Sequence, residues 1–331
     1  MKKKTKNLLV LAGVIAVLLI GYVVMDLFLE ADAKQQEEAS NANLELIDFK
    51  VEDISFYSYE NTEYEIGFHV TGDKYVHYED EKFPVNKTKV ASQLETLTNL
   101  KAFQEIPFTD KAEFGFDAPQ VKWLLTLSDG VTRTFSLGDK ALLQEAYYFL
   151  DEENNKIYLV DTDIYTMFTC SWSDLVQKED LILVGTDQIK EVTVEKEGEV
   201  VTKIHYEEEL EYPWQITTKE GTVDGDTNAV VSALGIFNSY IIRAVYEYDC
   251  NEFSPYGLET PSMITTVTYM DGEEEKTLVF EFGDLREDSY YYLRVNGSSY
   301  VNGMSSYSVK EMTEFSVESL KVVEAVEETS E

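Results

Sequence analysis

The chain contains three histidines, which are candidate ligands for a metal ion. His69 and His77 flank a Gly72-Asp73 turn, and His205 lies far from both. A two-residue loop would pair His69 with Val76 and direct His77 to the opposite face of the hairpin. A three-residue loop would place both histidines diagonally on one face, where they could share a metal. The sequence therefore leaves such a site open without predicting it.

The segment Asp224-Gly225-Asp226-Thr227-Asn228 begins like a calcium-binding loop, with side-chain oxygens at positions 1, 3 and 5. Position 6 is Ala229, where the loop requires glycine. Position 12 is Gly235, where it requires a bidentate glutamate. Capping of a helix N-terminus explains the same acidic residues. We therefore predict a helix cap, and a calcium-stabilised adhesion module stays as an alternative.

Motifs for nucleophilic catalysis are absent, since the chain has no G-x-S-x-G, S-x-x-K, His-Glu-x-x-His or P-loop sequence. Glycoside hydrolysis needs only two well-placed carboxylates, and this chain has 63 acidic residues. A carboxylate-dependent cell-envelope hydrolase is therefore a second alternative. No pair of acids stands out by spacing, and the runs 151–155 and 207–209 are expected to be solvated hairpin loops. We assign no catalytic residue, no cofactor and no metal ligand.

Charge excludes two classes of partner. The formal net charge of the 331 residues is −36, and four of the 27 basic residues are lysines within the first six positions. So acidic a surface repels both nucleic acid phosphates and anionic lipids. The only cysteines, Cys170 and Cys250, are expected to be isolated thiols, so the fold must depend on its hydrophobic core.

The N-terminus has the composition of a membrane anchor. Leu8 to Met25 is an uncharged run of 18 residues, which Leu27-Phe28-Leu29 extends. As a helix, the uncharged run would span about 27 Å, close to the thickness of a bilayer core. We predict a signal anchor over 8–29, with residues 1–7 cytoplasmic and the bulk of the chain extracytoplasmic. Cleavage after Ala33 is the alternative, and residues 30–44 are expected to be a polar linker.

Four landmarks occur twice in the same order, which indicates a tandem repeat. The first is Phe-Gly-Phe-Asp-Ala-Pro at 114–119 and Tyr-Gly-Leu-Glu-Thr-Pro at 256–261. An Asp-Gly hairpin turn, an apolar-Gly-Asp triplet and a tyrosine-rich strand follow in each copy. The eight landmark residues are Gly115, Pro119, Gly138 and Tyr148, matched by Gly257, Pro261, Gly283 and Tyr291. We interpret them as structural: glycine permits a turn, and proline keeps the residue before it extended.

Each copy is strand-rich with one main helix, which predicts the α+β class with mainly antiparallel sheets. Asn86 or Thr88 should cap the first main helix, which buries Val90, Leu94, Leu97 and Leu100. The second helix should bury Val230, Leu234, Phe237 and Ile241. The expected domains are a first repeat at 45–183, a second at 184–323 and an acidic tail at 324–331.

This order of elements resembles the bacterial family called domain of unknown function 4340, over about residues 45 to 325 and once per copy. The eight landmark residues carry the resemblance. It implies a membrane-anchored extracytoplasmic protein, associated with ABC transport systems of the gliding-motility type, and it supplies no catalytic residues. We therefore expect an accessory or binding protein of a membrane complex, attached through Leu8–Leu29.

Overall fold

The computed structural model describes residues 44–323, which form two compact units divided between Ser171 and Trp172. The expected anchor at 8–29, most of the expected linker and the tail at 324–331 lie outside the described residues. None of the helices within the described range is both long and apolar enough to cross a membrane. Residues 172–183, which we expected in the first repeat, lie in the second unit.

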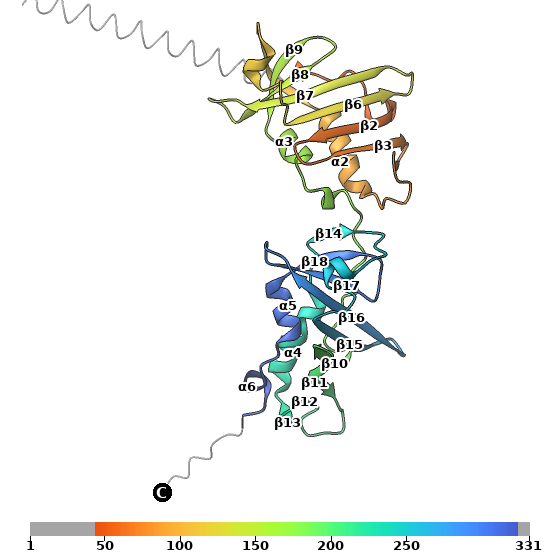
Figure 1. The fold of residues 1–331 in the computed structure, drawn as a ribbon, viewed down its shortest axis with the longest axis vertical. Helices are drawn as coiled ribbons and strands as arrows, with labels where there is room; N and C mark the ends of the chain where they lie inside the picture. The colour runs from red at the N-terminus through yellow and green to blue at the C-terminus, as the bar shows by residue number, and fades with distance from the viewer. Residues whose placement is uncertain (1–43, 324–331) are drawn as a thin grey trace, which may run out of the picture. The chain divides into compact units, whose positions relative to one another are not determined.

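The first unit is one nine-stranded antiparallel sheet with helices packed on it (Figure 1). Its strand order is β1-β5-β9-β8-β7-β6-β2-β3-β4. The strands are β1 Leu44–Glu45, β2 Ile54–Asn61, β3 Glu65–Thr71, β4 Lys74–His77, β5 Lys101–Ile106, β6 Val121–Leu127, β7 Thr132–Lys140, β8 Ala146–Asp151 and β9 Lys156–Asp161. The helices are α2 Lys87–Thr98 and α3 Asp163–Phe168, with short 3-10 turns η1 Val51–Asp53 and η2 Lys111–Phe114.

The helix α2 forms where the sequence predicts it. The Asn86 side chain caps it by accepting a hydrogen bond from the Lys89 N–H at 3.2 Å. Val90, Leu94 and Leu97 are buried on its inner face as predicted, and Leu100 is buried just beyond the end of the helix at Thr98. Strand β6 alternates in the same way, with Val121, Trp123 and Leu125 fully buried. One face of this sheet and one face of α2 therefore build the core of the first unit.

The second unit is also one nine-stranded antiparallel sheet, in the order β13-β12-β11-β10-β15-β16-β17-β18-β14. Its strands are β10 Ile189–Lys196, β11 Glu199–Tyr206, β12 Trp214–Thr218, β13 Gly221–Gly225, β14 Ala244–Glu247, β15 Met263–Asp271, β16 Glu274–Leu285, β17 Tyr290–Val295 and β18 Val301–Ser305. The helices are α4 Thr227–Leu234, α5 Ser306–Thr313 and α6 Val317–Leu320, with 3-10 turns η3 Trp172–Asp174, η4 Gly235–Asn238 and η5 Ser254–Tyr256.

The two sheets share the order of eight strands. In the first sheet these strands are β5-β9-β8-β7-β6-β2-β3-β4. Their counterparts in the second sheet, in the same spatial order, are β14-β18-β17-β16-β15-β10-β11-β12. The first sheet adds β1 at one edge, and the second adds β13 at the other. The α+β class is therefore confirmed, with a repeat-like pair of antiparallel sheets.

One helix differs from the prediction. The α-helix α4 ends at Leu234 and continues as the 3-10 turn η4. Val230, Leu234 and Phe237 are buried as predicted, but Ile241 follows the turn and is 49% exposed. A change from 3.6 to 3.0 residues per turn, followed by the end of the helix, breaks the spacing on which the prediction for Ile241 depended.

A buried polar network lies inside the first unit. The Tyr57 hydroxyl donates to Gln93 Oε1 at 3.0 Å, and Gln93 Nε2 donates to the Tyr59 hydroxyl at 3.0 Å. Tyr59 and Tyr64 share a hydroxyl contact of 3.1 Å, and the Tyr64 hydroxyl donates to the carbonyl of Cys170 at 2.8 Å. Burial raises the pKa of Tyr57 well above its usual value of 10. These hydroxyls therefore stay protonated and stabilise the core rather than acting as bases.

This network predicts a loss of stability at alkaline pH. Above about pH 10 the unfolded chain releases the Tyr57 proton while the folded chain keeps it, so stability falls with a slope of up to about 1.4 kcal/mol per pH unit. The variant Tyr57→Phe should lose about 1–3 kcal/mol at pH 8, because Gln93 Oε1 loses its donor. The same variant should show a shallower decline above pH 10. Urea unfolding between pH 8 and 11 measures both effects, and an unchanged alkaline slope in the variant would contradict the assignment.

Candidate functional site

The glycine landmarks lie together in each unit, at a close backbone contact. A Cβ atom on Gly138 would stand 2.1 Å from the carbonyl oxygen of Phe114, and one on Gly283 would stand 2.1 Å from that of Tyr256. The turns η2 and η5 end at Gly115 and Gly257, whose φ angles are +83° and +66°. The conformation suits glycine, and a Cβ there would also clash with the aspartate of the triplet. We call this arrangement the glycine contact.

The two prolines stand directly before strands. Pro119 precedes β6 by two residues, and Pro261 precedes β15 by two. The intervening residues already bond to the neighbouring strand: the Gln120 N–H donates to the Leu137 carbonyl at 2.7 Å. The Ser262 N–H donates in the same way to the Phe282 carbonyl at 3.1 Å. Each proline therefore positions the chain where sheet pairing begins.

The sequences of the two copies predict Tyr291 as the counterpart of Tyr148, but the strand register of the structure gives a different counterpart. Leu137 pairs with Phe149 in the first sheet, and its equivalent Phe282 pairs with Leu293 in the second. This register makes Tyr292 the counterpart of Tyr148. Ring contacts agree, since Phe114 packs edge-on against Tyr148 at 4.8 Å and Tyr256 against Tyr292 at 5.0 Å. A slip of one residue exchanges the two faces of a strand, so only the register identifies the pair.

Of the two loop lengths that the sequence leaves open for the hairpin β3–β4, the structure has the two-residue loop. His69 pairs with Val76, and His77 pairs with Phe68 on the other face. Burial lowers the pKa of His77, whose Nδ1 accepts the Asp80 N–H at 3.1 Å. Within residues 44–323 no group of three or more His, Cys, Asp or Glu side chains could hold a metal ion. Both cysteines are free.

The acidic segment before α4 caps the helix as predicted. Asp226 Oδ1 accepts the Ala229 N–H at 2.9 Å, while Asp224 Oδ1 accepts a hydrogen bond from Gln215 Nε2 at 2.9 Å. The two carboxylates therefore serve different partners, one in the helix and one on the neighbouring strand. The geometry is that of a cap.

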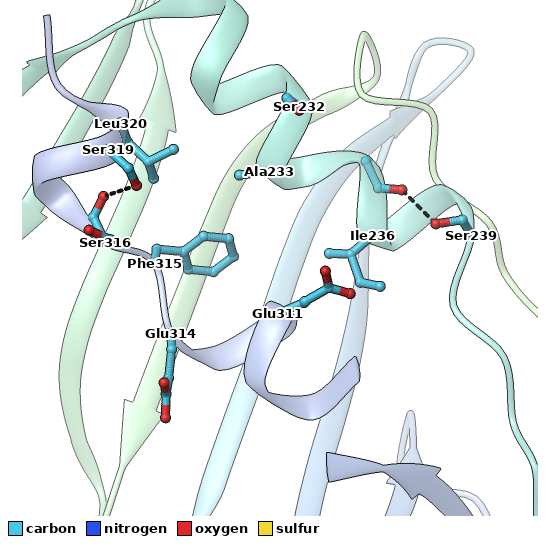
Figure 2. A pocket seen from close by; sticks show the side chains of 11 residues that line it. Ser232, Ala233, Ile236, Ser239, Glu311, Glu314, Phe315, Ser316, Ser319 and Leu320 are labelled. Atoms are coloured by element: carbon cyan, nitrogen blue, oxygen red, sulfur yellow. Dashed lines mark hydrogen bonds between the residues drawn. The ribbon is translucent and has the colours of Figure 1, made fainter. Parts of the chain in front are cut away.

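An open groove of about 640 Å³ crosses the second unit, where α4 and η4 face the segment from α5 to α6 (Figure 2). The groove stays open over Gly235, because a Cβ atom built there meets nothing within 4 Å. Backbone contacts attach the C-terminal side of the groove to the start of α4. Lys321 forms an antiparallel β-bridge with Gly225, and the Asp226 N–H donates to the Leu320 carbonyl at 2.7 Å. The lining residues are Ser232, Ala233, Gly235, Ile236, Ser239, Glu311, Glu314, Phe315, Ser316, Ser319 and Leu320.

The lining of the groove consists of serines, small or apolar residues and two glutamates. Two of its serines donate to nearby carbonyls, Ser239 Oγ to Gly235 at 3.1 Å and Ser319 Oγ to Ser316 at 2.8 Å. No histidine, cysteine, lysine or arginine is among these described lining residues. Glu311 points towards Ile236 and Glu314 points away (Figure 2), so the two carboxylates do not converge. The groove thus combines apolar side chains with serine hydroxyls and two glutamates.

The glycine contact predicts opposite effects for two Gly→Ala substitutions in the second unit. Gly283→Ala should destabilise the unit by about 1–3 kcal/mol, because the added Cβ overlaps the Tyr256 carbonyl. Gly235→Ala is the matched control: Gly235 has helical φ and open space, so alanine should be neutral or stabilise by up to about 1 kcal/mol. Urea unfolding compares the two, and equal stabilities would show that the contact is dispensable.

The cap on α4 gives a second test. Asp226→Ala should lose about 1 kcal/mol of stability, whereas Asp226→Asn should retain most of it because asparagine caps equally well. Adding a chelator should leave the melting temperature of the chain unchanged. A chelator-dependent decrease that disappears in Asp226→Ala would instead support the calcium alternative.

Comparison with known proteins gives one family match. The family model described as Domain of unknown function (DUF4340) matches residues 76–234, from β4 in the first unit to the end of α4 in the second. The resemblance predicts one match per copy over about 45 to 325, whereas the observed segment runs across the division between the units. Neither the curated proteins nor the solved structures include a match. Over residues 76–234, which include the landmarks Gly115, Pro119, Gly138 and Tyr148 of the first copy, the chain is therefore similar to the DUF4340 family.

Proposed function

We propose that this chain is a membrane-anchored extracytoplasmic binding protein, an accessory subunit of a membrane complex of the ABC transport type. The uncharged run from Leu8 to Met25 supports the anchor, and the lysines before it support a cytoplasmic N-terminus. The partner class follows from the family resemblance, which is an argument by association.

The observation that carries the binding role is the groove of the second unit. Ala233, Ile236 and Phe315 supply apolar surface, and the charged lining residues are both glutamates. Such a groove fits a peptide segment that inserts apolar side chains and places a basic residue beside Glu311. Complementary charge would add specificity and a faster association rate. We therefore propose a basic, amphipathic segment of a membrane subunit as the ligand.

We also propose that the two units are tandem copies of one ancestral domain. The shared order of eight strands and the glycine contact in both units support a duplication. A groove is present beside η4, where α4 gives way to a 3-10 turn, whereas α2 in the first unit is a regular helix of 12 residues. Divergence of the second copy would then have produced the binding surface.

Gly235 offers a matched pair of variants that tests the groove. Gly235→Phe should fill the groove and reduce recovery of the partner at least tenfold in a pull-down of the full chain from mild detergent. Gly235→Ala adds only one methyl group at the same position and should bind normally. Glu311→Lys should also weaken recovery, because it reverses the charge that faces the basic residue. Equal recovery with all three variants would contradict the groove, and the consistent absence of a transporter component would contradict the partner class.

A further inference from the structure

Two leucines at the tip of one loop are almost completely exposed. Leu142 is 98% exposed and Leu143 is 97% exposed, in the connection between β7 and β8. The next most exposed large apolar residue, Val323, is 79% exposed and lies at the end of the described range. Adjacent leucines with this exposure are costly in water, so they call for a partner.

The loop holds these leucines in a fixed turn. The Ala141 N–H donates to the Ala146 carbonyl at 2.8 Å, and the Ala146 N–H donates to the Gln144 carbonyl at 2.9 Å. An ion pair of 2.5 Å between Lys140 Nζ and Glu145 Oε2 closes the base. The equivalent connection in the second unit, between β16 and β17, carries Arg286, Glu287 and Asp288 instead. The apolar tip therefore belongs to the first unit alone.

The register of the sheet places this loop at the end where the described chain begins. Leu44 pairs with Ala102, Ala102 with Val160, Val160 with Tyr147, and Tyr147 with Lys140. These five residues form one row across β1, β5, β9, β8 and β7. Four strand spacings of about 4.8 Å separate Leu44 from Lys140 by roughly 19 Å. The base of the loop is thus close to the point at which the chain from the anchor enters the sheet.

The expected linker is short enough to keep this end near a bilayer. Fourteen residues, 30–43, separate the predicted anchor at 8–29 from Leu44. Fourteen residues can span at most about 50 Å, the length of a fully extended chain. Leu44 and the loop tip therefore both lie within reach of the membrane surface.

We propose that Leu142 and Leu143 insert into the outer leaflet and hold the first unit against the bilayer. The inference rests on the anchored topology proposed above. Residues 141–144 carry no charge, whereas the chain as a whole is strongly acidic, which favours zwitterionic over anionic lipid. Apolar side chains at a membrane interface bind in proportion to the surface they bury, and the tether raises their effective concentration there.

Fluorescence quenching in nanodiscs of zwitterionic phosphatidylcholine tests this proposal. The full chain carries Cys170→Ser and Cys250→Ser, so that a single new cysteine takes an environment-sensitive fluorophore. We compare Leu142→Cys with Glu287→Cys, the matched position in the equivalent loop of the second unit. Lipids bearing a nitroxide should quench the label at position 142 several-fold more strongly than at 287. Adding Leu143→Asp should remove most of that difference.

Two results would overturn the inference, and they are distinguishable. If the chain stays with the discs but both labels are quenched equally, the loop does not enter lipid and the anchored topology stands. If the chain separates from the discs on flotation, the anchor itself is wrong and the loop proposal fails with it.

Discussion

The close approach of a glycine in one strand to a carbonyl in the preceding turn is the constraint on which each unit depends. Gly138 and Gly283 let the turns η2 and η5 lie directly against the sheet, at a distance that no side chain allows. Gly115 and Gly257 end these turns with a positive φ. Pro119 and Pro261 then stand two residues before β6 and β15. The contact fixes where each turn meets the sheet, directly before the hairpin and the tyrosine-rich strand. Its presence in both units gives a physical reason for the recurrence of these short landmarks.

Local features of the fold could be predicted from the sequence because their causes are local. The cap at Asn86 and the helix α2 depend on residues only a few positions apart. Features that depend on distant segments were missed. The edge strands β1 and β13 are short and lack an alternating pattern, and the exposure of Ile241 follows from a change of helix type. The equivalence of Tyr148 with Tyr292 required the hydrogen-bond register.

The candidate surfaces were the least predictable part. The groove depends on α4, η4 and the chain from α5 to α6, which are about 80 residues apart in sequence and meet only in the folded unit. Its residues are serines, glutamates, a glycine and the apolar residues Ala233, Ile236, Phe315 and Leu320, and together they form no recognisable sequence motif. The network around Gln93 is similar, since a glutamine on a helix gives no sign that it will be buried between tyrosines. Candidate surfaces and buried polar groups of this kind follow from tertiary contacts and leave no local pattern in the sequence.

The central claim is that the chain acts by contact, through the groove of the second unit, on a membrane complex. Photo-crosslinking in intact cells tests it most directly. A photoreactive amino acid at Ser239, an exposed groove residue, is compared with one at Glu287, an exposed residue that does not line the groove. We predict a crosslink from position 239 to a membrane-complex subunit and none to that subunit from position 287. Identical crosslinking patterns at the two positions, or no protein partner at 239, would contradict the account.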